Sequence, residues 1–421
     1  MAGRETRRTG PIMPRSAPFI AAVALVVAVA PVAAAAHAYA VSTYPSPGAR
    51  LRVGPTGIRV TFDEAFTIPE RAIRIERAGR PVPCANPPHL DPGNALAMIC
   101  QFTGPLPRGA YDVRWRAVSD DSHTVHGVFS FGVDEKAPTA AVDAPDWWDP
   151  SSPLAVLLRW LALAGALIFA GGSFVAARFA DDAVVARRAT GIATIALWCC
   201  GIGTFAALPL QSIAIGGGFA GTFDAAAVSQ ALHSTWGAAW VVRAVLLVIA
   251  ILAGSSVRAL ALPVLLTFAF EGHAMQFQGW EQILAVGVDF AHFAGASIWL
   301  GSVVALAAAL PGSLRLVPRV APFALPGAAL VLASGVTAAA LHLGAWSDLV
   351  TTGYGRIVGT KAILLLVLLA LGWMNYRFGR GRGAANVATR TLYAEAIVAV
   401  VVVALSAALT GTAPPIHLTT G

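Results

Sequence analysis

From Leu154 almost to its C-terminus, the chain is a succession of apolar segments, and this pattern alone excludes an ordinary soluble fold. A membrane-spanning helix needs about 20 mostly apolar residues. Only 12% of the residues are charged, whereas soluble globular proteins have roughly 25%. The fourth segment is the least regular, because Pro263 interrupts it and Glu271 lies near its end. We predict an all-α transmembrane domain of eight helices over residues 154–415, at 154–177, 189–210, 236–254, 259–276, 281–308, 321–343, 357–376 and 391–412.

Residues 1–36 have the composition of a secretory signal peptide. An arginine-rich start precedes an apolar stretch at residues 19–32, and residues 34–36 offer an A-x-A cleavage site. Cleavage after residue 36 makes His37 the first residue of the exported chain. Overlapping A-x-A frames at residues 36–38 and 38–40 leave other cleavage positions open, and an uncleaved anchor is the alternative.

The basic residues of the loops predict the orientation of the membrane domain, because arginine and lysine favour cytoplasmic loops. If the region before residue 154 is outside, the inner loops carry Arg178, Arg187, Arg188, Arg258, Arg315, Arg319, Arg377, Arg380, Arg382 and Arg390. The outer loops between helices carry little beyond Arg356. We therefore predict a multi-pass protein of the bacterial plasma (inner) membrane, in contact with membrane lipid, with a periplasmic N-terminal domain and its C-terminus outside. The net charge of +7 lies mainly in the N-terminus and these loops, so we predict no nucleic-acid partner.

Residues 37–134 have the pattern of an all-β domain. Apolar and polar residues alternate at 58–62, 72–75 and 111–115, and turn-forming residues separate these short runs. This spacing is typical of a β-sandwich of about 100 residues. A linker rich in Ala, Pro and Asp follows at residues 135–153. Cys84 and Cys100 fall in the exported part, where a disulfide is favoured; two buried thiols or a soft metal site are the alternatives.

Asp121 and His123 form an Asp-x-His pair immediately before the last predicted strand. Together with a terminal His37, they supply an amine, two imidazoles and a carboxylate, a donor set that suits Cu(II). A turn with a surface histidine is the alternative for the pair alone. We expect His126 to lie on the strand surface and His89 to be exposed.

In the fifth apolar segment, His292 lies roughly 16 Å from the outer end, near the middle of the bilayer. An ionisable residue at this depth is expensive and is first interpreted as functional. Asp289, His292 and Trp299 share one helical stripe, so Asp289 is a candidate second-shell partner that orients or charge-balances His292. A structural hydrogen bond between helices is the alternative for this pair.

The other histidines of the membrane domain all fall on its outer side in this topology and suggest a path by which metal enters: His233, His273, His342 and His417. Cys199 and Cys200 lie near the depth of His292, but free cysteine is also a common small core residue. Glu395 and Lys361 are candidate gating or pairing charges.

Residues 37–48 resemble the start of the CopC family of copper-binding proteins, and residues 121–131 resemble the end of that domain. The resemblance implies a cupredoxin-like or Ig-like sandwich that binds Cu(II) through His37, Asp121 and His123. The methionine-rich segment of some relatives is missing, because Met98 is the only methionine of the domain. The membrane domain resembles the CopD family in Gly272-His273-Ala274, in His292 with Trp299-Leu300-Gly301, in residues 352–375, and in Glu395 with residues 412–415.

The sequence therefore predicts a fused CopC/CopD-type copper resistance protein, with copper as its metal and envelope cuproproteins or metallochaperones as partners. The exported domain is expected to capture Cu(II), and the membrane domain to pass copper inward. The chain has no G-x-x-x-x-G-K-[ST] motif, which argues against ATP-driven pumping, and we expect a transport protein and not an enzyme. The alternatives are a membrane redox protein (haem b or a copper reductase), and a copper chaperone or sensor.

Overall fold

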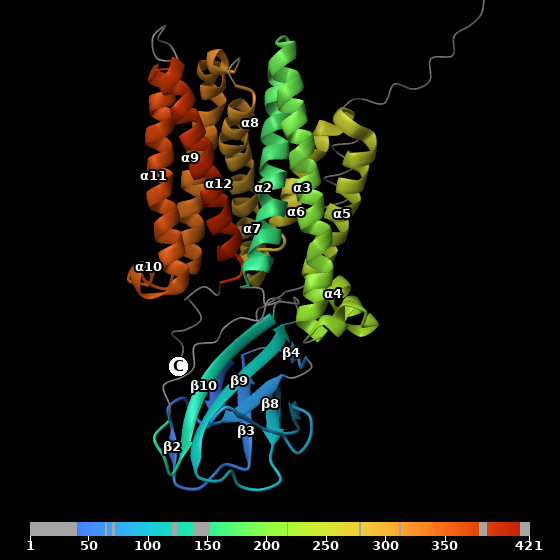
Figure 1. Ribbon diagram of the computed structural model, residues 1–421, viewed down its shortest axis with the longest axis vertical. Coiled ribbons are helices and arrows are strands. Elements are labelled where there is room, and N and C mark those ends of the chain that lie inside the picture. Colours follow the sequence, from blue (N-terminus) through green and yellow to red (C-terminus); the bar gives the residue numbers. More distant parts are fainter. Residues whose placement is uncertain are drawn as a thin grey trace, which may run out of the picture.

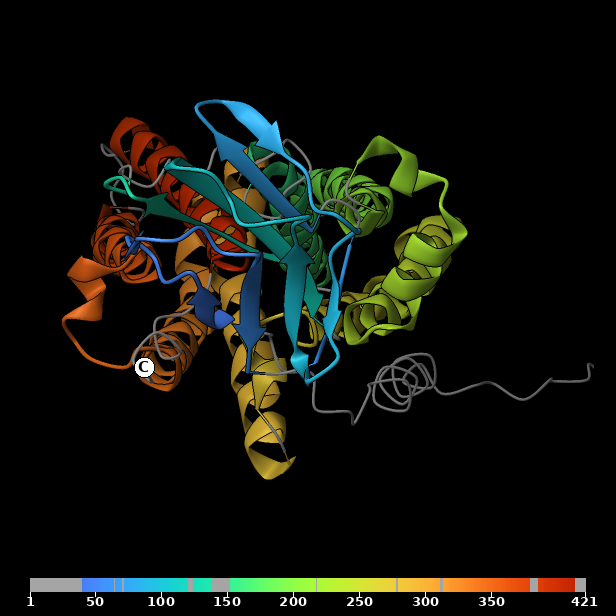
Figure 2. The same cartoon turned by 90° about the horizontal axis from the view of Figure 1, so that it is seen from below.

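A computed structural model describes residues 40–63, 65–69, 72–119, 124–137, 152–216, 218–277, 279–310, 313–378 and 385–412. The chain forms a β-sandwich followed by a bundle of long helices, and the sandwich lies against one end of the bundle (Figure 1). Viewed from the sandwich side, the strands lie across that end (Figure 2). We call this the near end of the bundle and the opposite one the far end.

The β-sandwich consists of two sheets. The first has the order β1 (Ala40–Tyr44), β3 (Gly57–Phe62), β8 (Asn94–Gln101) and β7 (His89–Asp91). The second has the order β2 (Arg50–Leu51), β10 (Thr124–Val133), β9 (Gly109–Ser119), β5 (Ile73–Arg77) and β6 (Arg80–Val82), with β4 (Phe66–Thr67) also paired to β9. All pairs are antiparallel except β2 with β10.

The alternation seen in the sequence places every second residue of these strands in the core. Ile58, Val60 and Phe62 of β3 are at most 1% exposed. Tyr111 of β9 stacks on Phe131 of β10, with ring centroids 5.1 Å apart. Full burial of a large apolar side chain contributes about 1.5–3 kcal/mol, so these residues hold the two sheets together.

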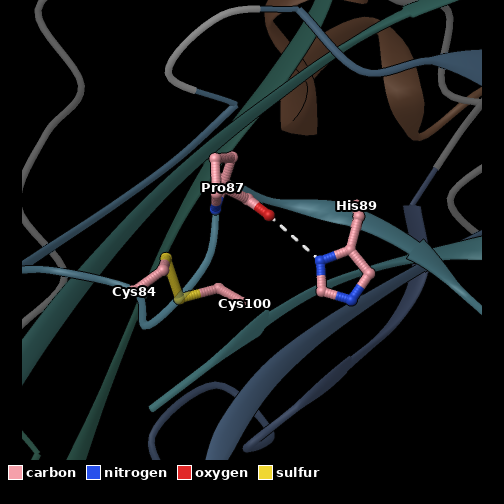
Figure 3. The surroundings of a disulfide bond; sticks show 4 residues. All are labelled: Cys84, Pro87, His89 and Cys100. Carbon is pink, nitrogen blue, oxygen red and sulfur yellow. Dashed lines mark hydrogen bonds between the residues drawn. A yellow bond between two sulfur atoms is a disulfide. The ribbon is translucent and has the colours of Figure 1, made fainter. Parts of the chain in front are cut away.

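A disulfide joins Cys84 to Cys100 of β8, which confirms the pairing favoured in the sequence analysis. Figure 3 shows the nearby His89, whose Nδ1 lies 3.0 Å from the carbonyl oxygen of Pro87. His89 is half-buried where the sequence led us to expect an exposed side chain. This local hydrogen bond holds the ring against its own loop.

The helical part consists of α2 (Pro153–Arg178), α3 (Ala183–Gly216), α4 (Ala225–His233), α5 (Thr235–Ala253), α6 (Ala261–Phe268), α7 (Gly279–Ala296), α8 (Ser302–Ala308), α9 (Val317–His342), α10 (Asp348–Thr351), α11 (Gly353–Phe378) and α12 (Ala385–Leu409). A π-helical turn, η4 (Ser297–Gly301), joins α7 to α8. Four 3-10 turns are η1 (Phe219–Thr222), η2 (Gly254–Leu260), η3 (His273–Gln276) and η5 (Leu314–Leu316).

The predicted count of eight membrane-spanning helices is not confirmed, because seven helices in the described part of the chain have the length and apolarity of a span. The fourth predicted segment forms α6, with 8 residues, between the 3-10 turns η2 and η3. Such a helix is about 12 Å long, less than half of a bilayer core of about 30 Å. After α6 the chain turns so that Glu271 forms a bidentate pair with Arg243. A buried carboxylate requires such a partner, which explains why the apolar run is not one continuous helix.

Glycines allow α2 to lie very close to its neighbours. A Cβ atom on Gly301 would lie 2.3 Å from the carbonyl oxygen of Leu167, and one on Gly171 would lie 2.4 Å from the carbonyl carbon of Gly301. On the other side of α2, a Cβ atom on Gly165 would lie 2.5 Å from the amide nitrogen of Cys200. Small residues at helix interfaces permit this close packing in membranes. Helix α2 is therefore the central helix around which α3 and α8 are fixed.

The β-sandwich contacts the near end of the bundle through apolar side chains. Val118, the second-last residue of β9, belongs to one buried cluster with Ile215 of α3 and with Ala227 and Ala231 of α4. Val118 and Ala231 are fully buried. The end of β9 is therefore fixed against the membrane domain.

Candidate functional site

The three predicted Cu(II) ligands His37, Asp121 and His123 lie outside the described residues. Their positions along the chain are nevertheless bounded. The described chain begins at Ala40, three residues after His37, and the Asp-x-His pair lies in the short connection from β9 to β10.

The strand ends next to these ligands lie at the same end of the β-sandwich. Ala40 pairs with Phe62 of β3. The ring of Phe62 lies 4.2 Å, centroid to centroid, from that of Phe66, and Phe66 pairs with Ser119, the last residue of β9. Two segments far apart in the sequence, one ending at residue 39 and one beginning at residue 120, are thus attached close together.

This end of the sandwich is the one that faces the helices. Val118, which contacts α3 and α4, directly precedes Ser119. Figure 1 shows β4 and the adjoining end of β9 beside α4. A metal held by the segments attached here would lie between the sandwich and the near end of the bundle.

In the membrane domain, the hydrogen bonds of His292 define its chemistry. Its Nδ1 lies 3.0 Å from Oγ of Ser334 on α9. The Ser334 hydroxyl donates its own proton to the carbonyl oxygen of Leu330, at 2.5 Å. The serine oxygen can then accept a hydrogen bond from Nδ1–H of His292. In this tautomer Nε2 carries a free lone pair and can bind a metal.

The sequence did not single out Ser334 and Gly335, although both lie beside His292. A Cβ atom on Gly335 would lie 3.5 Å from Cε1 of the imidazole, so a larger residue would crowd the ring. The sequence contained one indication of these residues, a Ser-Gly pair in the middle of an apolar segment. Such pairs also occur where helices simply pack closely.

Asp289 lies one helical turn nearer to the start of α7 than His292. Its hydrogen-bonding role toward His292 stays a prediction, since the imidazole bonds to Ser334. A Cβ atom on Gly272 would lie 3.3 Å from Oδ2 of Asp289, so the segment that carries His273 approaches this carboxylate closely. Lys361 of α11 interacts electrostatically with both Asp289 and His292.

The remaining histidines do not gather at one centre. His233 is exposed and bonds through Nδ1 to the carbonyl oxygen of Ser229 in its own helix. His342 is buried beside Phe277. His126 is exposed on β10, as expected. Within the described ranges, no three His, Cys, Asp or Glu side chains form one metal-binding group, so the membrane histidines are spread along the bundle.

Four further residues were named from the sequence: His273, His417, Cys199 and Cys200. The backbone of His273 belongs to η3, next to Gly272, whereas His417 lies outside the described residues. Cys200 is fully buried in the helical core, which agrees with its interpretation as a packing residue. Cys199 is half-buried.

The pair of Arg243 and Glu271 fixes the segment before α7. Two hydrogen bonds of 2.8 and 2.5 Å join the guanidinium to the carboxylate. The guanidinium also lies 4.2 Å from the ring centroid of Phe268. Because Gly272 and His273 follow Glu271 directly, this pair determines where they meet α7.

The fold defines a class of protein: a β-sandwich followed by a helical domain with seven helices long and apolar enough to span a membrane in the described part of the chain. Residues 40–134 match the CopC domain, residues 149–283 the copper resistance protein D-like N-terminal domain, and residues 314–409 copper resistance protein D. The chain belongs to the CopC/CopD family of copper resistance proteins.

Individual relatives agree with this assignment. The chain is 25% identical over 410 residues to the copper transport protein CutJ of Bacillus subtilis (strain 168), covering 90% of this chain and 75% of CutJ. It is 32% identical over 88 residues to copper resistance protein C of Escherichia coli, covering 19% of this chain and 68% of that protein. The crystal structure of PcoC, a methionine-rich copper resistance protein from Escherichia coli, aligns at 29% identity and a TM-score of 0.21, covering 23% of this chain and 99% of PcoC.

Proposed function

We propose that this protein binds copper where the β-sandwich meets the membrane domain and passes it through the bundle toward the far end. The family and the named copper transport and copper resistance relatives support copper as the ion. In this proposal, His37, Asp121 and His123 hold Cu(II) in the exported domain. His273 and His292 then belong to the membrane path.

The observation that carries the proposal is the hydrogen bond between Nδ1 of His292 and Oγ of Ser334. When Nδ1 donates in this bond, Nε2 presents a lone pair inside a helix that has the length and apolarity of a membrane span. An imidazole nitrogen is a good ligand for copper. Metal-binding histidines typically donate their other ring N–H in this way, which fixes the orientation of the ring.

The charges near the helix ends support an orientation in which copper that moves toward the far end enters the cell. Figure 1 places the C-terminal ends of α2, α5, α8 and α11 at the far end. Arg178, Arg258, Arg315 and Arg377 lie at or near these helix ends in the sequence, whereas residues 217–234 and 343–352, which connect helices at the near end, contain no arginine or lysine. By the positive-inside preference, the far end is cytoplasmic, and the β-sandwich lies outside the plasma membrane.

A haem-binding redox protein is not favoured. An axial pair requires two histidines at matching depths. His292 is hydrogen-bonded to Ser334 of α9, so the two residues lie at the same depth. His342 lies eight residues after Ser334 on the same helix, about 12 Å away along its axis. The two histidines are therefore at different depths. In addition, the named relatives are copper transport and copper resistance proteins.

Copper accumulation in cells tests the proposal. Cells expressing the wild type should accumulate more copper than cells expressing His123→Ala or His292→Ala at matched protein levels. His89→Ala is the matched control, because His89 bonds to the carbonyl oxygen of Pro87 in its own loop and is not among the proposed ligands, and it should behave as the wild type. Equal accumulation in the wild type and in both test variants would rule out import through His292.

A further inference from the structure

A buried carboxylate, remote from the proposed copper ligands, is unused by the function described above. Glu395 of α12 is only 2% exposed. Its Oε2 accepts a hydrogen bond of 2.5 Å from Nδ2 of Asn375 on α11. Trp299, in the π-helical turn η4, also hydrogen-bonds to this carboxyl group. Residues from three separate parts of the membrane domain thus converge on one carboxyl group.

The amide of Asn375 has partners on both sides. Its Oδ1 lies within hydrogen-bond distance of the Thr391 hydroxyl, which is also close to the carbonyl oxygens of Val387 and Ala388, and its NH2 group donates to Glu395. The indole of Trp299 is likewise only a donor. Asn375 and Trp299 are both neutral. They donate hydrogen bonds to the carboxyl oxygens of Glu395 but do not compensate a negative charge there.

The surrounding elements add no charge to this site within the described ranges. The elements packed most extensively against α12 are α11, α2, α8 and η5, and Asn375 and Trp299 of η4 are the side chains that hydrogen-bond to Glu395. Arg377, Arg390 and Tyr393 are exposed, and Arg315 pairs with Asp182. Tyr376 follows Asn375 directly and carries no charge. The other charged or titratable groups of α2 and α11 lie elsewhere along these helices: Arg159, Arg178, Tyr354, Arg356 and Lys361.

An ionised carboxylate that is buried without a cation is strongly disfavoured, at membrane depth above all. The donor set also argues against a metal. One carboxyl group and an amide oxygen already engaged by Thr391 offer hard oxygen ligands, whereas Cu(I) selects sulfur. A proton is the ligand that neutralises such a site.

The site lies near the far end and is linked to His292. Gly372, whose Cβ atom would lie 3.2 Å from Oε1 of Glu395, is six residues from the end of α11, or about 9 Å. Trp299 follows His292 by seven residues in the same continuous helical segment, about 10 Å along the axis. The turn η4, which contains Trp299, is π-helical, and such turns are often found at functional sites.

We propose that Glu395 is a proton-binding site that exchanges its proton with water at the far end, and that this proton controls copper movement through the α7–η4 segment. The O–H bond forms on a carboxyl oxygen with a proton from far-end water, and release returns the proton to that side. The control of copper movement rests on the function proposed above, whereas proton binding does not.

Infrared spectroscopy of the purified, copper-free full chain tests proton binding. The wild type should show the C=O stretch of a protonated carboxyl group, and Glu395→Gln should lose this band. Glu281→Gln, which alters an exposed carboxylate at the start of α7, should keep it. If Glu395→Gln fails to fold, Asn375→Leu retains Glu395 but removes its donor, so the band should shift. A band unaffected by the foldable variant overturns the proposal.

Copper uptake into proteoliposomes, with the far end facing a lumen of set pH, tests the control of copper movement. Uptake by the wild type and by Glu281→Gln should vary with lumenal pH, and Glu395→Gln should lose this variation. A pH response retained in Glu395→Gln contradicts the control of copper movement. Absence of uptake in the wild type at every pH would refute the transport function instead, and the infrared result would still decide on proton binding.

Discussion

Replacing Arg243 by methionine would leave the Glu271 carboxylate without its cation. Arg243 is 2% exposed, and its guanidinium makes both hydrogen bonds of the pair. Removing one partner of a buried ion pair costs about 3–5 kcal/mol, because the other charge stays buried. Replacing both partners by apolar residues of similar volume is often neutral. The single variant should therefore be much less stable than the double variant Arg243→Met/Glu271→Met.

The free energy of unfolding of the full chain in detergent, measured by titration with SDS, checks this expectation. Arg243→Met should lower it by about 3–5 kcal/mol, and the double variant should lie much closer to the wild type. Arg356→Met removes an exposed arginine and should change it by about 0.5 kcal/mol or less. Equal losses in the single and double variants would refute the reasoning, because the loss would then come from packing and not from an unpaired charge.

Three further predictions concern the disulfide, the central helix and the histidine site. Because the Cys84–Cys100 bond closes a loop of 16 residues, Cys84→Ser/Cys100→Ser should destabilise the β-sandwich by about 3 kcal/mol, and unchanged hydrogen exchange in β8 would contradict this. Gly301→Leu should cost at least about 1–3 kcal/mol by forcing α2 and η4 apart, whereas Gly191→Leu, which meets open space, should not; equal SDS stabilities would disprove the contact. In a His123→Ala background, Ser334→Ala should weaken copper binding roughly 10–100-fold in a chelator competition, and Thr337→Ala, an exposed residue of the same helix, serves as the control. An unchanged copper affinity in Ser334→Ala would show that Ser334 does not contribute to copper binding.

The sequence was most informative where one physical rule acts over many residues. Alternating apolar residues predicted strands such as β3, and apolar segments of bilayer length predicted seven of the long helices. The fourth segment is not confirmed as a span, and the reason is that hydropathy is an average over a window. It does not register that one charged residue, Glu271, finds its partner 28 positions earlier in Arg243.

Prediction of the candidate site from the sequence was limited in the same way. His292 was recognisable from its type and depth alone, but its partner Ser334 is 42 residues away and became identifiable only once α7 and α9 were placed side by side. Glu395 was noticed as a buried charge, whereas its donors Asn375 and Trp299 come from two other elements. Pairing between helices is fixed by packing, which no local pattern encodes.

Copper flux through the purified protein is the most direct test of the central claim. The full chain is reconstituted in liposomes with the β-sandwich outside and a copper-sensitive chelator within, and copper is supplied as Cu(II) or, in parallel, as Cu(I) with ascorbate. The account predicts entry of copper with wild-type protein and at least tenfold slower entry with His292→Ala, a factor that corresponds to about 1.4 kcal/mol. It predicts wild-type entry with His89→Ala, which alters a histidine outside the proposed path. Entry through His292→Ala at the wild-type rate would contradict it.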